Sequence, residues 1–209
     1  MSSEGRIVYL IDDEEAIRRS AGFMLKTSGF SVKPFTSGVE FLKEGKDIEP
    51  GCILLDVRMP GMDGLEVQRA LLERGSTLPV IVMTGHGDVN VAVQAMKAGA
   101  VDFIEKPFEK ATLMSALEEG FSRLERTDRS RVRREEAKVR LQALTPRECD
   151  VLHGLAKGHP NKTIAYDLDI SARTVEIHRA NLMSKLGAAS LSEALRIAFA
   201  AGLGENDEA

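Results

Sequence analysis

Five residues whose side chains could transfer a phosphoryl group stand near the ends of apolar runs. They are Asp12, Asp13, Asp56, Thr84 and Lys106. Carboxylates that lie close together repel one another unless a cation sits among them, and oxygen-only ligands suit Mg²⁺ or Mn²⁺. An acceptor carboxylate, a divalent ion, a hydroxyl and an ammonium can together carry out phosphoryl transfer, because the two cations neutralise charge on the phosphoryl oxygens. The pattern therefore predicts this chemistry.

These side chains can meet only if the segments before them form one sheet. Over residues 1–124, strand-like runs alternate with helix-like segments, and the runs read RIVYLI, SVKPF, CILLD, PVIVMT and VDFIE. Such a (βα)₅ order favours a parallel, doubly wound sheet of the α/β class, whose strands end at one common edge. Asp56 ends a buried run and would lie at that edge. In the fourth unit, Val89, Val93 and Met96 repeat at helical spacing, which predicts an apolar stripe.

The chain changes character after its first domain. Residues 125–140 hold seven basic and four acidic residues and little apolar content, which predicts a charged linker that continues as a helix. Residues 141–204 show only helical patterns, with capping boxes at Thr145–Glu148 and Ser190–Glu193. This region predicts a compact all-α domain of four helices, followed by an acidic tail at residues 205–209.

Composition restricts the class of protein. The chain has 209 residues, of which 43% are hydrophobic and 29% charged, as in soluble globular proteins, and no apolar run is long enough to span a membrane. The two cysteines, Cys52 and Cys149, lie too far apart in sequence to suggest a disulfide framework, so we expect a cytoplasmic setting. The net charge of −4 gives no general argument for nucleic-acid binding. Any such argument must rest on local placement.

A short helix, a turn and a longer helix at residues 161–187 match the layout of a helix-turn-helix. At about 100° per residue, Val175, Leu182 and Leu186 of the longer helix share the face toward the core. The opposite face is small and mixed, so it can enter a major groove. On periodicity alone, an ordinary solvated helix face remains the alternative.

The candidate DNA contacts are Lys162, Arg173, Thr174, Glu176, Ile177, Ala180, Asn181 and Lys185. Lys162, Arg173 and Lys185 could neutralise phosphates. Glu176 could accept a hydrogen bond from cytosine N4, and Ile177 could contact a thymine methyl group.

Residues 1–124 resemble the receiver domain of two-component response regulators, which has a flavodoxin-like fold. The matching pattern is Asp-Asp after the first strand, Asp56 with MPGMDG, Thr84, and Lys106-Pro107, in that order. The resemblance implies that a sensor histidine kinase phosphorylates Asp56, and that Thr84, Phe103 and Lys106 are the residues of the switch and the phosphoryl site.

The same resemblance implies a set of Mg²⁺ ligands. Asp13 and Asp56 would bind the ion directly, Asp12 through water, and Arg58 through its backbone carbonyl. The chain would accept a phosphoryl group and lose it slowly, without acting as an enzyme on a separate substrate.

The sequence from Leu144 to Gly187 resembles the LuxR-type DNA-binding domain, which with a receiver defines the NarL/FixJ class of regulators. Two stretches, TGHGDVNVAVQAMKAGAVDFIEKPFE and NKTIAYDLDISARTVEIHRANLM, resemble the nitrogen-fixation regulators within it. This resemblance implies a FixL-like, oxygen-sensing haem kinase as phosphoryl donor, promoter DNA and RNA polymerase as partners, and activation of nitrogen-fixation and microaerobic genes.

We expect phosphorylation to act by forming a homodimer, because helix-turn-helix units commonly bind two half-sites as a pair. Asn90, Val93 and Lys97, on the helix expected to begin near Asp88, form the predicted receiver–receiver surface together with the neighbouring fifth strand.

Three other functions compete with this interpretation. A phosphatase of the haloacid-dehalogenase type would need an aspartate two residues after Asp56, where this chain has Arg58. A ligand-sensing LuxR regulator would need an apolar pocket in place of the acidic cluster. A receiver that serves only as a dimer module would not need the intact set of five phosphoryl-site residues.

Overall fold

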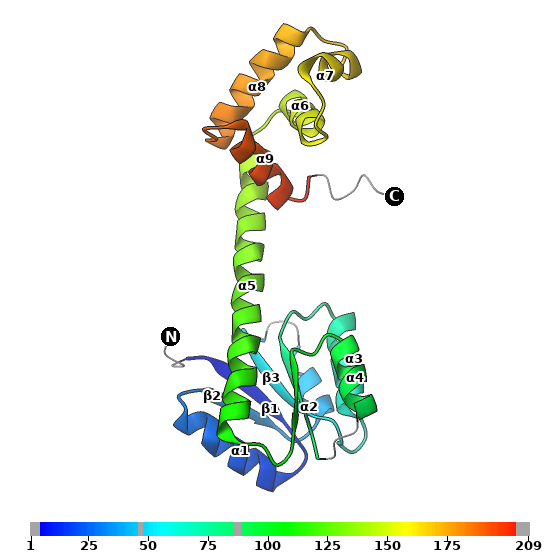
Figure 1. The fold of residues 1–209 in the computed structure, drawn as a ribbon, viewed down its shortest axis with the longest axis vertical. Coiled ribbons are helices and arrows are strands. Elements are labelled where there is room, and N and C mark those ends of the chain that lie inside the picture. The colour runs from blue at the N-terminus through cyan, green and yellow to red at the C-terminus, as the bar shows by residue number, and fades with distance from the viewer. Residues whose placement is uncertain (1–4, 46–47, 86–88, 204–209) are drawn as a thin grey trace. The chain divides into compact units, whose positions relative to one another are not determined.

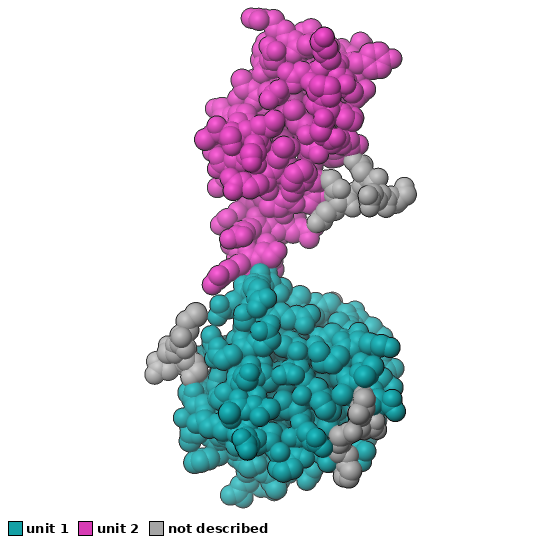
Figure 2. Space-filling view, in the orientation of Figure 1, with its two compact units in different colours: residues 1–127 teal, residues 128–209 magenta. Residues whose placement is uncertain are grey.

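The computed structural model describes residues 5–45, 48–85 and 89–203 of the chain. It divides into two compact units, residues 1–127 and residues 128–209 (Figure 2). No helix in the described ranges is both long and apolar enough to cross a membrane.

Five parallel strands form the sheet of the first unit, in the order β2-β1-β3-β4-β5 (Figure 1). They are β1 (Ile7–Ile11), β2 (Ser31–Phe35), β3 (Gly51–Asp56), β4 (Val80–Thr84) and β5 (Asp102–Glu105). The chain order reverses between β1 and β3, which are neighbours, and ligands of such sheets bind at the carboxyl ends of the strands beside this reversal. The predicted doubly wound sheet is confirmed.

Helices cover both faces of the sheet. They are α1 (Glu15–Thr27), α2 (Gly38–Leu42), α3 (Gly64–Glu73), α4 (Val89–Lys97) and the long α5 (Lys110–Gln142). In β3, Cys52 and Leu54 pack in the cluster that holds the apolar side chains of α1 and α5, whereas Ile53 and Leu55 pack in the cluster of α2 and α3. Because β3 is buried on both faces, it reads as a continuous apolar run.

The side chains that α4 buries differ from those predicted. Val93 and Met96 are 45% and 46% exposed, whereas Ala95 is fully buried and Val91 packs against the core. The prediction followed the largest side chains, but the helix packs through a small one. The side chain of Val89 lies outside the described residues, as does Asp88.

Four helices and the end of α5 build the second unit. They are α6 (Pro146–Ala156), α7 (Asn161–Asp167), α8 (Ala172–Leu186) and α9 (Leu191–Ala200). Ala137 of α5 is buried in the same core cluster as Leu152, Val175 and Leu182. The all-α domain is confirmed, and the described part of α5 runs without a break through the charged linker.

The predicted helix caps differ in how completely they form. Thr145 and Glu148 make the full reciprocal box at the start of α6. Ser190 caps the backbone N–H of Glu193, but the Glu193 carboxylate accepts from the N–H of Ala189 instead, so the second box forms only in half. The chain reverses after α8 because Gly187 takes the left-handed conformation, with φ of 62°.

Candidate functional site

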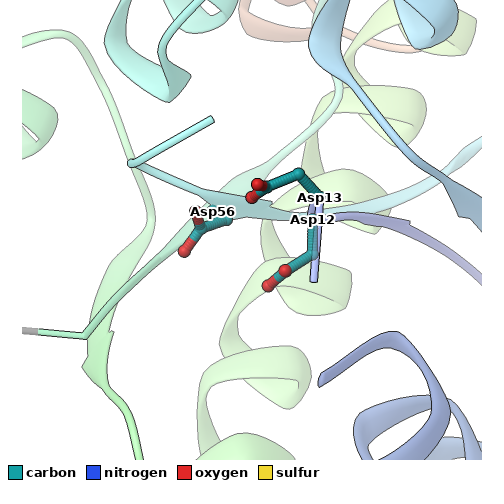
Figure 3. A group of neighbouring side chains, drawn as sticks. All are labelled: Asp12, Asp13 and Asp56. Carbon is teal, nitrogen blue, oxygen red and sulfur yellow. The ribbon is translucent and has the colours of Figure 1, made fainter. Parts of the chain in front are cut away.

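Three carboxylates meet where β1 and β3 end (Figure 3). Asp12 follows β1 and is fully buried, Asp56 closes β3 and is 4% exposed, and Asp13 is exposed to solvent. One oxygen from each carboxylate lies within 4.8 Å of the other two. The sheet topology creates this cluster, since β1 and β3 are adjacent although some forty residues separate the two ends in sequence.

Lys106 brings a positive charge into the same cluster. Its Nζ donates hydrogen bonds to Oδ2 of Asp12 and to Oδ1 of Asp56, each at 2.6 Å. The backbone N–H of Lys106 donates to the carbonyl of Thr84 at 2.6 Å, which fixes the residue beside the end of β4. Two strand ends thus hold the carboxylates, and the segment after β5 supplies the ammonium.

The electrostatics of the cluster reflect its burial. Burial raises the pKa of the Asp56 carboxyl group, and the charges of Asp12 and Asp13 add to this, while the Lys106 ammonium acts in the opposite direction. For Lys106, burial lowers the pKa, but hydrogen bonds to Asp12 and Asp56 outweigh it and raise the pKa overall. The ammonium therefore stays protonated, and a second cation near Asp56 would favour its ionised form.

The donor set of the cluster fits a hard divalent cation. Three carboxylates against one ammonium leave negative charge, and all the ligand atoms that they offer are oxygens. Mg²⁺ keeps several waters and takes one or two carboxylates, which suits a group with exposed Asp13 at its rim. Arg58 lies two residues beyond Asp56 with an exposed side chain, and its backbone carbonyl remains a predicted ligand.

A close backbone approach fixes the loop that follows Asp56. A Cβ atom on Gly64 would lie 2.3 Å from the carbonyl oxygen of Asp56, so this position excludes any side chain. The N–H of Gly64 donates to the carbonyl of Val57 at 2.9 Å, and Asp63 caps α3 in a reciprocal box with Glu66. The sequence signal for this cap is the Asp63-Gly64 pair before a helical pattern, with Glu66 three residues after Asp63.

Asp12 is held by groups that the sequence did not single out. Its Oδ1 accepts from the N–H of Glu14 at 2.9 Å, and its backbone carbonyl accepts from Nη1 of Arg18 at 2.6 Å. Arg18 is one of two adjacent arginines on α1, and its spacing from Asp12 carries no motif. Only the fold shows which of the two arginines reaches back.

The two predicted switch residues lie on neighbouring strands. Thr84 is buried at the end of β4, and Phe103 is half-buried on β5, where it pairs in register with Val82. Phe103 packs against the core cluster that also contains Ala95 of α4. His86, after Thr84, lies outside the described residues.

The outward face of α8 is exposed as the helical periodicity predicts. Val175, Leu182 and Leu186 are buried, and Ile177 is 53% exposed. The other exposed candidates on this helix are Arg173, Glu176, Ala180, Asn181 and Lys185, and Lys162 is exposed on α7. Thr174 is half-buried, and its hydroxyl lies 2.7 Å from that of Ser171 in the helix cap.

Two basic residues of α8 are engaged within the unit. Nζ of Lys185 donates to the buried carboxylate of Glu148 at 2.7 Å and so ties α8 to α6. Nη1 of Arg179 donates to Oδ1 of Asn161 at 2.7 Å and ties α8 to the start of α7. Lys185 is therefore engaged with Glu148, and its phosphate contact stays a prediction, whereas the sequence did not reveal the role of Arg179.

Both units match described sequence families and solved structures. The family "Response regulator receiver domain" matches residues 8–118, and "Bacterial regulatory proteins, luxR family" matches residues 142–198. The chain is 49% identical to the transcriptional regulatory protein FixJ of Azorhizobium caulinodans, over 97% of this chain and 96% of that protein. It is 42% identical to the tetrathionate response regulatory protein TtrR of Salmonella typhimurium, over 90% of each. Full-length FixJ from B. japonicum has a similar structure, with a TM-score of 0.60 and 44% identity over 95% of this chain and 98% of that one.

Proposed function

Since this chain belongs to the two-component response regulators that carry a LuxR-type DNA-binding domain, we propose that a sensor histidine kinase phosphorylates Asp56 and thereby controls binding to promoter DNA. The observation that carries this proposal is the Lys106 ammonium, which bonds to both Asp12 and Asp56. Burying several charges together is costly in free energy, and such clusters concentrate at functional sites.

In the proposed reaction, a carboxylate oxygen of Asp56 attacks the phosphorus atom of a phosphohistidine on the kinase. The O–P bond forms as the N–P bond breaks, and the imidazole nitrogen keeps the electron pair. Asp13, Asp56 and the carbonyl of Arg58 would hold Mg²⁺, which would neutralise negative charge on the phosphoryl oxygens. Lys106 supplies a second positive charge, and Asp12 orients the ammonium of Lys106. The acyl phosphate then hydrolyses slowly, so the chain is a switch rather than an enzyme with its own substrate.

The proposed switch depends on the hydroxyl group of Thr84. This hydroxyl donates a hydrogen bond to a phosphoryl oxygen, and the Phe103 side chain moves into the space that Thr84 leaves. Phosphorylation shifts a population between two arrangements, because the new charge favours only one of them. The affected surface on α4 carries Asn90, Val93 and Lys97, which are exposed and are the proposed dimer contacts.

A dimer places two copies of α8 on two DNA half-sites. Glu176 and Ile177 read base edges, with Ala180 and Asn181 beside them, while Arg173 and Lys162 contact phosphates. The bound promoters then recruit RNA polymerase. Action on chromosomal DNA places the protein in the cytoplasm.

The name FixJ of a relative at 49% identity supports nitrogen-fixation and microaerobic genes as targets and a FixL-like kinase as donor. A relative at 42% identity is named for its response to tetrathionate, so the stimulus varies within proteins of this similarity. The target genes therefore need direct identification from bound DNA.

The test uses the full chain with acetyl phosphate and Mg²⁺. The wild-type protein should take up one phosphoryl group, and Asp56→Asn should take up none. Asp63→Asn is the matched control, because Asp63 is a nearby aspartate that only caps a helix, and asparagine caps equally well. Genomic fragments retained before and after phosphorylation are then sequenced.

Phosphorylation of Asp56→Asn at the wild-type rate would contradict the assignment of the acceptor. Equal retention of the same fragments with and without acetyl phosphate would contradict control of DNA binding. Recovery of nitrogen-fixation promoters would support the proposed targets, and their absence among enriched fragments would refute them.

A further inference from the structure

The four helices α6–α9 carry little net positive charge for a DNA-binding unit. Residues 143–203 contain seven basic and six acidic residues. Of the basic ones, Lys185 is bonded to Glu148 and Arg179 to Asn161. Phosphate contacts supply most of the affinity for DNA. These helices alone therefore offer few positive charges for such contacts.

The end of α5 that belongs to the second unit is strongly basic instead. Residues 128–142 contain six basic and three acidic residues. Ala137 of this segment is buried in the core of the unit, and Leu141 packs against that core. The segment is therefore structurally part of the DNA-binding unit, and its basic residues lie on a continuous helix that is anchored in that unit at Ala137 and Leu141.

Three arginines of this segment share one side of the helix, and we call them the arginine stripe: Arg129, Arg133 and Arg140. At about 100° per residue they fall within an arc of about 40°. The rise of an α-helix spaces them over about 17 Å. All three are exposed, and Arg133 and Arg140 make no ion pair with any described residue of the chain.

The opposite side of the same segment is electrostatically different. Arg131 and Lys138 lie about 140–180° from the members of the stripe and form ion pairs with Asp128 and Glu135, respectively. Of the three acidic residues in the segment, Glu136 alone borders the stripe. The stripe itself lies about 60° from Ala137, so it flanks the face that packs into the unit.

We propose that the arginine stripe of α5 binds the DNA sugar–phosphate backbone next to the site contacted by α8. This inference rests on the proposed DNA-binding function and extends the contact surface beyond the helix-turn-helix. A row of guanidinium groups along one side of a helix complements a row of phosphates, and exposed arginines bind phosphate with two N–H groups at once. Such contacts strengthen binding to every sequence equally, because phosphates carry no base identity.

The test compares two double variants of the full chain, which remove equal charge from opposite sides of α5. Arg133→Ala with Arg140→Ala removes two members of the stripe. Arg131→Ala with Lys138→Ala is the matched control. All four positions are exposed and alanine favours helix, so both variants should fold, which circular dichroism checks. Binding to a long duplex of arbitrary sequence is measured over a range of salt concentrations, with acetyl phosphate and Mg²⁺ present.

The stripe variant should bind more weakly than wild type, and its plot of log affinity against log salt should be shallower by about 1 for each lost phosphate contact. The control variant should keep the wild-type slope, and the preference for operator over arbitrary DNA should stay unchanged in both. Equal losses in the two variants would mean that only net charge matters and would overturn the proposal.

The proposal would also be overturned if the unphosphorylated stripe variant bound DNA more tightly than unphosphorylated wild type. The stripe would then bind the acidic receiver and inhibit the protein. Arg173→Ala separates this inference from the proposed function. If Arg173→Ala weakens binding and the stripe variant does not, the stripe proposal fails and the DNA-binding function stands. If wild type binds no DNA, the function itself fails.

Discussion

The two functional regions of this chain are built in opposite ways. At the ends of β1 and β3, buried charges from separate segments bond to one another, with Lys106 joined to both Asp12 and Asp56. On α8, the predicted reading residues are exposed and come from one helix, and the bonds within the unit are made by other residues, Arg179 and Lys185. Chemistry requires fixed atoms held in place before the reaction, whereas recognition requires a surface that its partner completes.

This contrast predicts how the two regions respond to mutation. A change in the buried cluster should alter folding and function together, because the same bonds serve both. A change on the exposed face of α8 should alter DNA binding and leave stability unchanged, since surface substitutions usually shift stability by about 0.5 kcal/mol or less.

The largest effect is expected for Lys106→Ala. Loss of the ammonium leaves Asp12 and Asp56 buried without a counter-charge, and breaking a buried pair in this way costs about 3 kcal/mol or more. Urea unfolding without Mg²⁺ should show that loss in the first unit. Mg²⁺ should stabilise the variant more than wild type, since the variant has no other cation between the carboxylates.

Lys110→Ala is the control for this experiment, because Lys110 is exposed at the start of α5. If Lys106→Ala unfolds at the wild-type urea concentration, the ammonium does not hold the carboxylates together. The receiver site would then resemble the α8 face, and the contrast between the regions would fail.

The second prediction tests the proposed link between the regions. Val93→Asp puts a charge on the exposed face of α4, where it should block dimer formation and leave phosphorylation of Asp56 intact. Two linked half-site contacts gain about a hundredfold or more over one, so operator affinity should fall by about that factor. Sedimentation with acetyl phosphate gives the mass, and a dimer of Val93→Asp would place the interface elsewhere.

The third prediction concerns two substitutions on α8. Glu176→Ala should cost about 1–3 kcal/mol at the preferred base pair and relax the preference there. Arg173→Ala should weaken binding to all sequences and reduce the salt dependence. Binding to a panel of single-base operator variants separates the two effects. Thermal unfolding of both variants should match wild type, and a clear loss of stability would show that this face also supports the fold.

The acidic cluster could be predicted from the sequence because its residue types are fixed by chemistry and its position by topology. Asp12, Asp56 and Lys106 each follow an apolar run, and parallel strands bring such ends to one edge. What could not be predicted is how the cluster is supported. Arg18 donates to the backbone carbonyl of Asp12, and position 64 requires glycine because a Cβ atom there would lie 2.3 Å from the carbonyl oxygen of Asp56. Neither contact leaves a periodic signal in the sequence.

The helices could be located from their caps and periodicity, but the partners of individual polar residues could not. Val175, Leu182 and Leu186 are buried as predicted, because burial follows the helical repeat. Lys185 has the same spacing as a surface lysine and yet bonds to Glu148, thirty-seven residues away. Long-range pairs of this kind depend on the crossing of α6 and α8, which the local pattern does not define.

The smallest effect is expected for the pair of Lys185 and Glu148. This prediction tests whether an ion pair also stabilises the fold of the second unit. The hydrogen bond from Lys185 holds the pKa of Glu148 below its usual value, and the backbone N–H of Thr145 adds to this. Because the folded state lowers this pKa, the pair stabilises the fold above the ordinary pKa of glutamate, about 4.3, and loses its effect as the pH falls below that value. Lys185 is well exposed, so the pair contributes about 1 kcal/mol or less to the free energy of unfolding.

Glu148→Gln should lower the unfolding temperature of the second unit at pH 7. The decrease in unfolding temperature between about pH 5 and pH 3 should be smaller in this variant than in wild type. Calorimetry that shows the same acid dependence in Glu148→Gln and wild type would remove Glu148 as the titrating group.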